Sequence, residues 1–265
     1  EPQKQKKEDG TDRISYSGAM PDPATAITCT AWAYIVNNTA NPATFFREWA
    51  SGATTTITCA INSAGVVDPG YYTAGGSAVV SGTLSLGVWY RIAVSCTGTA
   101  GKFYLATGAA GVTQVGTGTV AGSASPVGFT VGGRAPLDAV EWLDGRMAQV
   151  RVWSSVLTQA QVETEWASPT PVVTSGLWAD WPLPGSADLT DHSGNGRDLV
   201  AGTTAVTTEP DPPLIPPGTI GLRAPGGAIL NLFRNEVMTI LAHPEEPGDL
   251  RITVLTRRGE SLWET

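Results

Sequence analysis

Three carboxylates near the middle of the chain, Asp138, Glu141 and Asp144, form the acidic group best placed to act as a catalytic pair. Retaining glycoside hydrolysis needs two carboxyl groups about 5 Å apart, and alternate positions of one strand supply that distance. The spacing here is three and three, and Asp144 opens an Asp-Gly turn signal. The sequence therefore predicts loop and turn carboxylates, and we expect a protein that is not an enzyme.

A second acidic motif, residues 191–196, matches the opening of a calcium-binding loop, with oxygen-bearing side chains at positions 1, 3 and 5 and glycine at position 6. Position 12 is Gly202, where such a loop carries a bidentate Glu. The missing Glu favours the alternative, an Asx turn followed by glycines. His192 and His243 are the two histidines of the chain, and neither belongs to a recognisable Ser or Cys catalytic motif.

Aromatic rings in loops are further candidates for ligand binding, because an exposed ring can stack on a sugar ring. Tyr71 and Tyr72 fall in a predicted loop over residues 65–76, and Trp142 falls next to the Asp-Gly turn. These three are the candidate glycan-binding residues, although packing at the end of a sheet is the alternative for Trp142. The strand and helix periods predict core positions for Trp32, Trp89, Trp153, Trp166 and Trp181.

The two ends of the chain carry the residues best suited to contact other proteins. Residues 1–13 are polar and of mixed charge, so this arm cannot build a packed core alone. Residues 219–265 follow a proline-rich linker over 209–218 and form a β-rich element too small to be stable alone. We expect the ends to dock on the main domain or on other chains of a larger, oligomeric assembly. The candidate assembly residues are Lys4, Lys6, Lys7, Phe233, Arg257, Arg258 and Trp263.

Composition excludes several classes of partner. The net charge is −8, so the chain lacks the basic character that nucleic acids or anionic membranes attract. No apolar run approaches the roughly 20 residues that span a bilayer. Cys29, Cys59 and Cys96 are widely spaced and lie in strand-like runs. We expect them to be buried as small apolar side chains, with one disulfide as the alternative.

Short strands and tight turns must position all of these groups. The 31 glycines and 19 prolines favour a chain of many strands over a helical one. Residues 27–35 alternate strictly, with Thr28, Thr30, Trp32 and Tyr34 on one face. Residues 88–95 alternate in the same way, with Trp89, Arg91, Ala93 and Ser95 on one face.

The stretch from 143 to 166 predicts a turn, a strand and one short helix. Thr158 and Gln161 have the spacing of a capping box, and Val162 and Trp166 share a helical face. In the strand, one face is expected to carry Met147, Gln149, Arg151 and Trp153, and the other Ala148, Val150 and Val152.

Three stretches of this chain follow one another in a recognisable order. They are Ala31-Trp-Ala-Tyr34, then 86–94 with its hairpin to 102–105, and then the turn, strand and helix of 143–166. Together they resemble the concanavalin A-like lectin/glucanase superfamily, in its laminin G-like and pentraxin-like branch found in bacterial and phage surface proteins. The resemblance covers roughly residues 13–205. It implies an all-β jelly-roll sandwich of two antiparallel sheets over residues 14–208, with the helix on its rim.

The resemblance also bears on ligands. Pentraxin-like members place calcium ligands just before the Asp-Gly turn, where Asp138 and Glu141 fall. Residues 135–137 replace the carboxylate and amide ligands expected there, so calcium is an option and no other cofactor is implied. Hydrolase members carry E-x-D-x-x-E or E-x-D-x-E on one strand, and this chain has no such run.

Two functions follow from these observations. The first is a structural or interaction protein: a laminin G-like surface or decoration subunit, with a phage virion among the options, anchored through its terminal segments. The second is a glycan-binding module, with or without calcium. Both place the protein outside the cell or on a virion surface.

Overall fold

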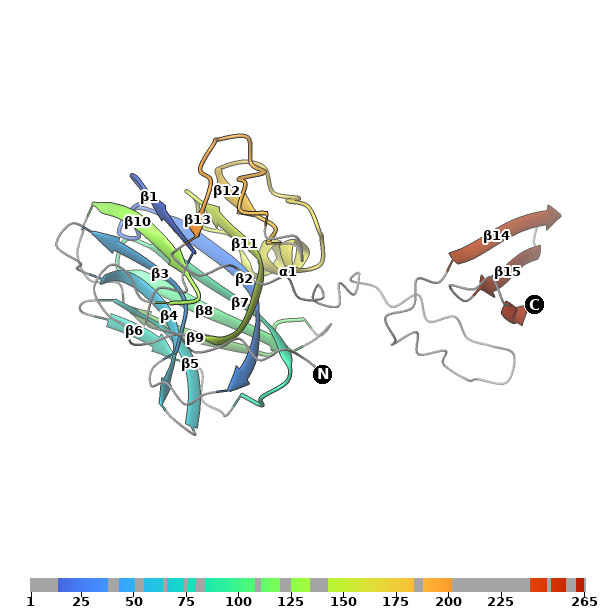
Figure 1. Ribbon diagram of the computed structural model, residues 1–265, viewed down its shortest axis with the longest axis horizontal. Coiled ribbons are helices and arrows are strands. Elements are labelled where there is room, and N and C mark those ends of the chain that lie inside the picture. Colours follow the sequence, from blue (N-terminus) through green and yellow to red (C-terminus); the bar gives the residue numbers. More distant parts are fainter. Residues whose placement is uncertain are drawn as a thin grey trace. The chain divides into compact units, whose positions relative to one another are not determined.

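The computed structural model describes residues 14–37, 43–50, 55–63, 66–73, 76–79, 84–107, 111–119, 125–133, 143–183, 188–201, 239–246, 249–255 and 261–264. The chain divides into two compact units, Glu1–Pro217 and Gly218–Thr265. Two antiparallel sheets and one short helix build the first unit (Figure 1), which confirms the all-β sandwich. No helix among the described residues is long and apolar enough to cross a membrane.

The first sheet has seven strands in the order β13-β1-β10-β3-β4-β5-β6. Its strands are β1 (Ile14–Ser17), β3 (Ala43–Ala50), β4 (Thr55–Ser63), β5 (Val66–Thr73), β6 (Gly76–Val79), β10 (Pro126–Val131) and β13 (Val200–Ala201). The second sheet has six strands in the order β12-β11-β2-β7-β8-β9. Its strands are β2 (Ile27–Asn37), β7 (Trp89–Thr97), β8 (Ala100–Thr107), β9 (Gln114–Thr119), β11 (Asp144–Trp153) and β12 (Leu177–Trp181).

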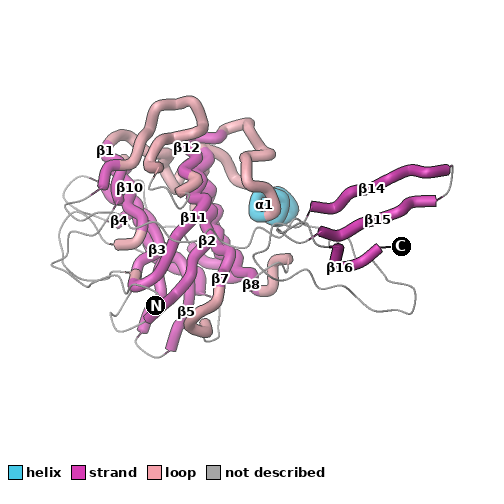
Figure 2. The backbone as a smooth tube through the Cα atoms, turned by 45° about the vertical axis from the view of Figure 1, so that its right-hand side comes forward, coloured by secondary structure: helices cyan, strands magenta, loops and turns pink. Residues whose placement is uncertain are grey.

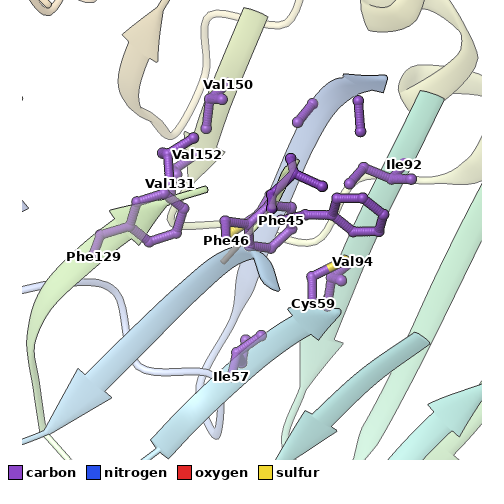
Figure 3. Packing of buried hydrophobic residues seen from close by; sticks show 14 of the residues in the cluster. Phe45, Phe46, Ile57, Cys59, Ile92, Val94, Phe129, Val131, Val150 and Val152 are labelled. Atoms are coloured by element: carbon purple, nitrogen blue, oxygen red, sulfur yellow. The ribbon is translucent and has the colours of Figure 1, made fainter. Parts of the chain in front are cut away.

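The main core lies between the two sheets. Figure 3 shows side chains from β3, β4 and β10 meeting side chains from β7 and β11. Phe129 stacks on Phe46 with ring centres 5.7 Å apart and on Trp181 at 5.5 Å, so three aromatic rings fill the middle. The residues of β2 and β7 that point into this core share one face of each strand, as the alternation predicted, and that face is the one opposite Trp32 and Trp89.

The three cysteines are buried in this core as free thiols, which confirms the first prediction and makes the disulfide alternative wrong. Burial raises the pKa of each thiol, that of Cys96 to about 12. These side chains therefore act as small apolar groups.

Strand β11 departs from the predicted alternation because it contains a bulge. Ala148 lies opposite Trp32 and Arg151 lies opposite Thr30, so three steps on β11 match two steps on β2. Gln149 occupies the bulge with a φ of 48°, and its N–H donates to the Pro182 carbonyl at 2.8 Å. The faces exchange at this point. Met147 packs against the core and Ala148 lies on the outer face, the reverse of the prediction.

Helix α1 (Gln159–Trp166) forms as predicted. Thr158 and Gln161 make the capping box, with the Gln161 N–H donating to the Thr158 hydroxyl at 3.3 Å and the Thr158 N–H donating to the Gln161 side chain at 2.9 Å. Val162 and Trp166 are buried. Figure 2 shows the helix beside the six-stranded sheet.

The second unit contains one described sheet, in the order β14-β15-β16. Its strands are β14 (Thr239–Glu246), β15 (Asp249–Leu255) and β16 (Ser261–Glu264). The pairing of β15 with β16 confirms the β-rich character predicted for this element.

Candidate functional site

The outer face of the six-stranded sheet carries a regular array of side chains. Because directly opposite residues of antiparallel strands share a face, the register fixes four rows. The rows are Arg146–Tyr34–Trp89, Ala148–Trp32–Arg91–Ala106, Arg151–Thr30–Ala93–Tyr104 and Trp153–Thr28–Ser95–Lys102.

One half of this face, the rows of Arg151 and Trp153, is closed by α1 and the segments beside it. Its buried residues form a second hydrophobic cluster of Ala93, Tyr104, Ala106, Trp153, Leu157, Val162 and Trp166. Two polar groups on the strands of this half have partners in the covering segments. The Trp153 indole donates to the Val173 carbonyl at 2.7 Å, and the Thr28 hydroxyl donates to the Ser155 carbonyl at 2.8 Å.

Arg151 fastens the helix to the sheet, and it is only 1% exposed. Its guanidinium pairs with Glu165 at 3.1 Å and with Asp180 at 3.0 Å, and it also donates to the Glu165 carbonyl. Its remaining N–H groups donate to the carbonyls of Ser168 and Pro169. All five N–H donors of the side chain are thus satisfied, and the Glu165 carbonyl in the last turn of α1 gains a hydrogen-bond donor.

The other half holds a group of rings and cations that we call the aromatic–arginine patch: Trp32, Tyr34, Trp89, Arg91 and Arg146. The ring centre of Trp89 lies 5.4 Å from that of Tyr34 and 6.3 Å from that of Trp32. The Arg146 guanidinium lies 5.0 Å from the Tyr34 ring centre, and the Arg91 guanidinium lies 5.2 Å from that of Trp32. These distances are typical of aromatic and cation–π contacts.

The solvent exposure of the side chains decreases from the outer end of the patch, at Tyr34, Trp89 and Arg146, to its inner end at Trp32. Tyr34, Trp89 and Arg146 are half-buried, and Val36 beyond them is 47% exposed. The prediction that Trp89 is a core residue is therefore wrong. The period placed it on a face, but the described part of the chain does not bury that face completely at Trp89.

The inner end of the patch is buried but incompletely satisfied. Trp32 is 1% exposed and lies outside both hydrophobic clusters. Its indole N–H, like that of Trp166 in α1, has no hydrogen-bond acceptor in the structure. Arg91 lies between these two indoles, 5.5 Å from the Trp166 ring centre. Burial lowers the pKa of Arg91, and the charge of Glu163 opposes that shift.

Gly145 allows β11 and β2 to approach closely at the patch. A Cβ atom at this position would lie 2.1 Å from the backbone oxygen of Tyr34. Any side chain here would push the strand that carries Tyr34 away. The Asp-Gly signal in the sequence thus marks a close approach of two strands beside the patch.

The structure describes three of the residues that the sequence nominated as sites, and none of the three belongs to the five residues of this patch. Tyr71 and Tyr72 lie in β5, opposite Cys59 and Thr58, so the predicted loop over 65–76 is wrong. Trp263 lies in β16, opposite Val254. The other nominated residues lie outside the described residues: Trp142, Asp138, Glu141, Lys4, Lys6, Lys7, Phe233, Arg257 and Arg258.

The motif at 191–196 is an Asx turn, as its missing Glu indicated. One Asp191 oxygen accepts the N–H groups of Ser193 and Asp180, at 2.9 and 3.0 Å, and the other accepts the Arg197 N–H and the Ser193 hydroxyl. The Asn195 side chain donates to carbonyls of β12. The turn therefore covers the free edge of β12 with side chains. Over the described residues, no group of three acidic, histidine or cysteine side chains is arranged to hold a metal ion.

Sequence reasoning missed the aromatic–arginine patch although its signal was present. The alternation over 27–35 and 88–95 put Trp32, Tyr34, Trp89 and Arg91 on matching faces. Pairing β2 with β7 in register would have brought them together.

Comparison with solved structures found several chains that are similar to this one. The chain is similar to a heptameric SAP-like pentraxin from Limulus polyphemus, at 17% identity and a TM-score of 0.46, with 62% of this chain and 78% of that chain covered. It is similar to a putative carbohydrate binding protein from Bacteroides ovatus, at 17% identity and a TM-score of 0.47, with coverage of 74% and 59%.

The enzymatically active domain of tailspike protein 2 from bacteriophage CBA120 is similar at 15% identity and a TM-score of 0.48, with coverage of 64% and 28%. The chain thus spans less than two thirds of the Bacteroides and phage proteins. No curated protein matches it.

The family comparison covers more of the chain. The family model described as the concanavalin A-like lectin/glucanases superfamily, in its laminin G form, matches residues 8–163, more than half of the sequence. That range includes both sheets' central strands and most of α1. The chain belongs to the concanavalin A-like lectin/glucanase superfamily, as a laminin G-like domain.

Proposed function

We propose that this protein is a non-catalytic carbohydrate-binding module and that its glycan stacks on Tyr34 and Trp89. The observation that carries the proposal is the half-buried ring pair, tilted by 53°, with the Arg146 guanidinium over one ring. Ligand sites combine apolar ring surface with a few polar groups that fix orientation. A sugar has the C–H surface that stacks on such rings.

The described buried carboxylates support a non-catalytic role. Glu165 and Asp180 are bound to Arg151 beneath the helix, and Glu48 lies in the sandwich core with one oxygen accepting from the Thr56 hydroxyl. Asp191 is saturated by turn donors. Each of these groups has a structural task, and hydrolysis needs a pair facing the substrate.

The test is a glycan array on the full chain, with and without calcium, followed by titration calorimetry of the best ligand. Tyr34→Ala and Trp89→Ala are each expected to weaken binding about twofold to tenfold, because an aromatic contact contributes about 0.5–1.5 kcal/mol. The matched control is Tyr16→Ala, a half-buried ring on the seven-stranded sheet, which should leave the affinity unchanged.

Absence of binding to every glycan in both conditions would refute the proposal, as would unchanged affinity in both patch variants. A dependence on calcium would point to Asp138 and Glu141, the ligands that the family resemblance suggests.

A role as a surface or decoration subunit, on a virion or elsewhere outside the cell, is compatible with glycan binding and remains a prediction from the terminal segments. Removing residues 1–13 or 219–265 should abolish assembly and leave the sandwich folded. Light scattering of the truncated chains tests this, and normal assembly would contradict it.

A further inference from the structure

We infer that Asn195 is a site of spontaneous deamidation, and that conversion of its amide to a carboxylate releases the turn of residues 191–197 from strand β12. The inference is independent of the proposed function. It follows from the chemistry of one Asn-Gly pair and from the contacts that the Asn195 amide makes.

The pair Asn195-Gly196 has the features that this reaction needs. It is the one Asn-Gly pair in the sequence, and both residues are exposed. Gly196 has a φ of 68°, and a Cβ atom placed on it would find nothing within 4 Å apart from its chain neighbours, so the peptide is uncrowded. Among the described contacts, the Gly196 N–H donates to no acceptor and the side-chain oxygen of Asn195 accepts from no donor. The attacking nitrogen and the carbonyl group that it attacks are therefore both unoccupied there.

The reaction consumes only water. The Gly196 nitrogen attacks the side-chain carbonyl carbon of Asn195, and the new C–N bond closes a succinimide ring. The bond from that carbon to the amide nitrogen breaks, and the nitrogen leaves as ammonia with the proton that Gly196 gives up. Water then opens the ring at either carbonyl and leaves aspartate or isoaspartate at position 195. Glycine favours the first step because it has no side chain to hinder the approach.

The amide group that is lost fastens the turn to the strand. Its nitrogen donates to the carbonyls of Leu177 and Trp178, at 3.2 and 3.1 Å, and to the Ser193 hydroxyl at 2.9 Å. A carboxylate has acceptors only, so it would face two carbonyl oxygens with no proton to share. The conversion thus replaces attractive contacts with repulsion.

The effect is confined to one end of β12, which is an edge strand of its sheet. At the other end, Asp191 accepts the Asp180 N–H at 3.0 Å, and the reaction does not touch this contact. At the affected end, Asn195 shares the Trp178 carbonyl with Arg197, whose guanidinium lies 4.3 Å from the Trp178 ring centre. Deamidation therefore weakens the cover of the first half of this edge, and edge strands without cover are open to pairing with other chains.

The first experiment is peptide mapping by mass spectrometry, after incubation of the full chain at mildly acidic and at alkaline pH. Asn195 should convert faster than every other asparagine, and faster at alkaline pH, because the attacking nitrogen has to lose its proton. Asn62, which precedes Ser63 in β4, is the internal comparison. Asn195→Gln keeps an amide but disfavours ring closure, so position 195 should stay unconverted in that variant. Conversion of Asn195 no faster than that of Asn62 would overturn the inference.

The second experiment is hydrogen exchange of full-length variants, followed over β12 and over the central strand β2. Asn195→Asp carries the charge of the product and should exchange about tenfold faster than the parent over β12, because hydrogen bonds are lost and repulsion is added. The matched control Asn195→Ala removes the amide without adding charge and should show a smaller increase. Exchange over β2 should stay at the parent rate in both variants. Parent-like exchange over β12 in Asn195→Asp would overturn the inference, and so would an equal rise over β2, which would show that the effect is not confined to the turn and its strand.

Discussion

The two halves of the outer face of the six-stranded sheet carry the same kinds of residue, but the surroundings of these residues differ. In the closed half, Arg151 has every donor satisfied and Trp153 donates to a carbonyl. In the aromatic–arginine patch, Arg146 stacks on a half-buried ring, and Trp32 has an indole N–H without an acceptor. Arg146 and Arg151 even lie on the same strand. The difference teaches that the packing around an arginine, and not its presence on a strand, decides how deeply it is buried.

Energetics explain why the distinction is informative. Buried polar groups are nearly always hydrogen-bonded, because an unmet donor costs about 1–3 kcal/mol. Arg151 and Trp153 in the closed half obey this rule, whereas the buried indole N–H groups of Trp32 and Trp166 do not.

The largest expected effect comes from breaking the closed half. Arg151→Met should lower the free energy of unfolding by about 3–5 kcal/mol, because it leaves Glu165 and Asp180 buried without their cation. Burial already raises the pKa of Asp180, against the influence of Arg151. Urea denaturation followed by tryptophan fluorescence measures the change. A loss below about 1 kcal/mol would show that the arginine is not the clamp.

Glu48 offers a pH test in a buried group outside both halves. Burial raises its pKa well above the ordinary 4.5, and one of its oxygens has no partner in the structure. The neutral acid is thus favoured by folding. Its stabilising contribution is complete below pH 4.5 and is lost as pH rises toward the folded-state pKa, by up to about 1.4 kcal/mol per pH unit.

Glu48→Gln should therefore be more stable than the parent at pH 7 and close to it at pH 4. Urea midpoints of both proteins at the two pH values provide the measurement. A variant less stable than the parent at pH 7 would mean that the carboxyl group is needed in its ionised form.

The helix cap tests how strongly α1 holds the closed half by itself. Thr158→Ala removes the hydroxyl that accepts the Gln161 N–H and should cost about 1 kcal/mol, while Thr158→Ser should be close to neutral. Denaturation curves compare the three proteins. If Ala and Ser behave alike, the capping box contributes little beside the Arg151 contacts.

The smallest effect on stability is expected in the patch. Arg146→Met makes the same chemical change as Arg151→Met on the same strand and face, yet it should shift the free energy of unfolding by no more than about 0.5 kcal/mol. The pair of variants, measured side by side, isolates the role of the surroundings. Similar losses in both would erase the distinction between the two halves.

Sequence patterns predicted the structure correctly where residues close together in the chain determine it. Alternation put Ile92 and Val94 on one face, which the structure buries, and the spacing of Thr158 and Gln161 predicted the start of the helix. The patterns failed where contacts with distant parts of the chain determine the structure. Period assigned Trp89 to a face without saying how much of that face is covered, and Pro and Gly suggested a loop where β5 pairs with β4 and β6.

The bulge was beyond such reasoning for a related reason. Gln149 has a φ of 48°, a conformation that glycine adopts readily and glutamine seldom does. The residue types around position 149 do not indicate this conformation. It is imposed by tertiary contacts, among them the Pro182 carbonyl that binds its N–H.

The extra residue at Gln149 determines which side chains of β11 share a face on the two sides of the bulge. Arg146 and Arg151 are five positions apart, an odd number that would put them on opposite sides of a regular strand. The bulge restores them to one side, so β11 presents both the helix clamp and the Arg146 side chain of the patch on one face. Loss of one residue there would turn Arg146 toward the core and leave Arg151 in place. A single insertion or deletion at this point thus decides which side chains the first half of β11 presents beside the rings of β2 and β7.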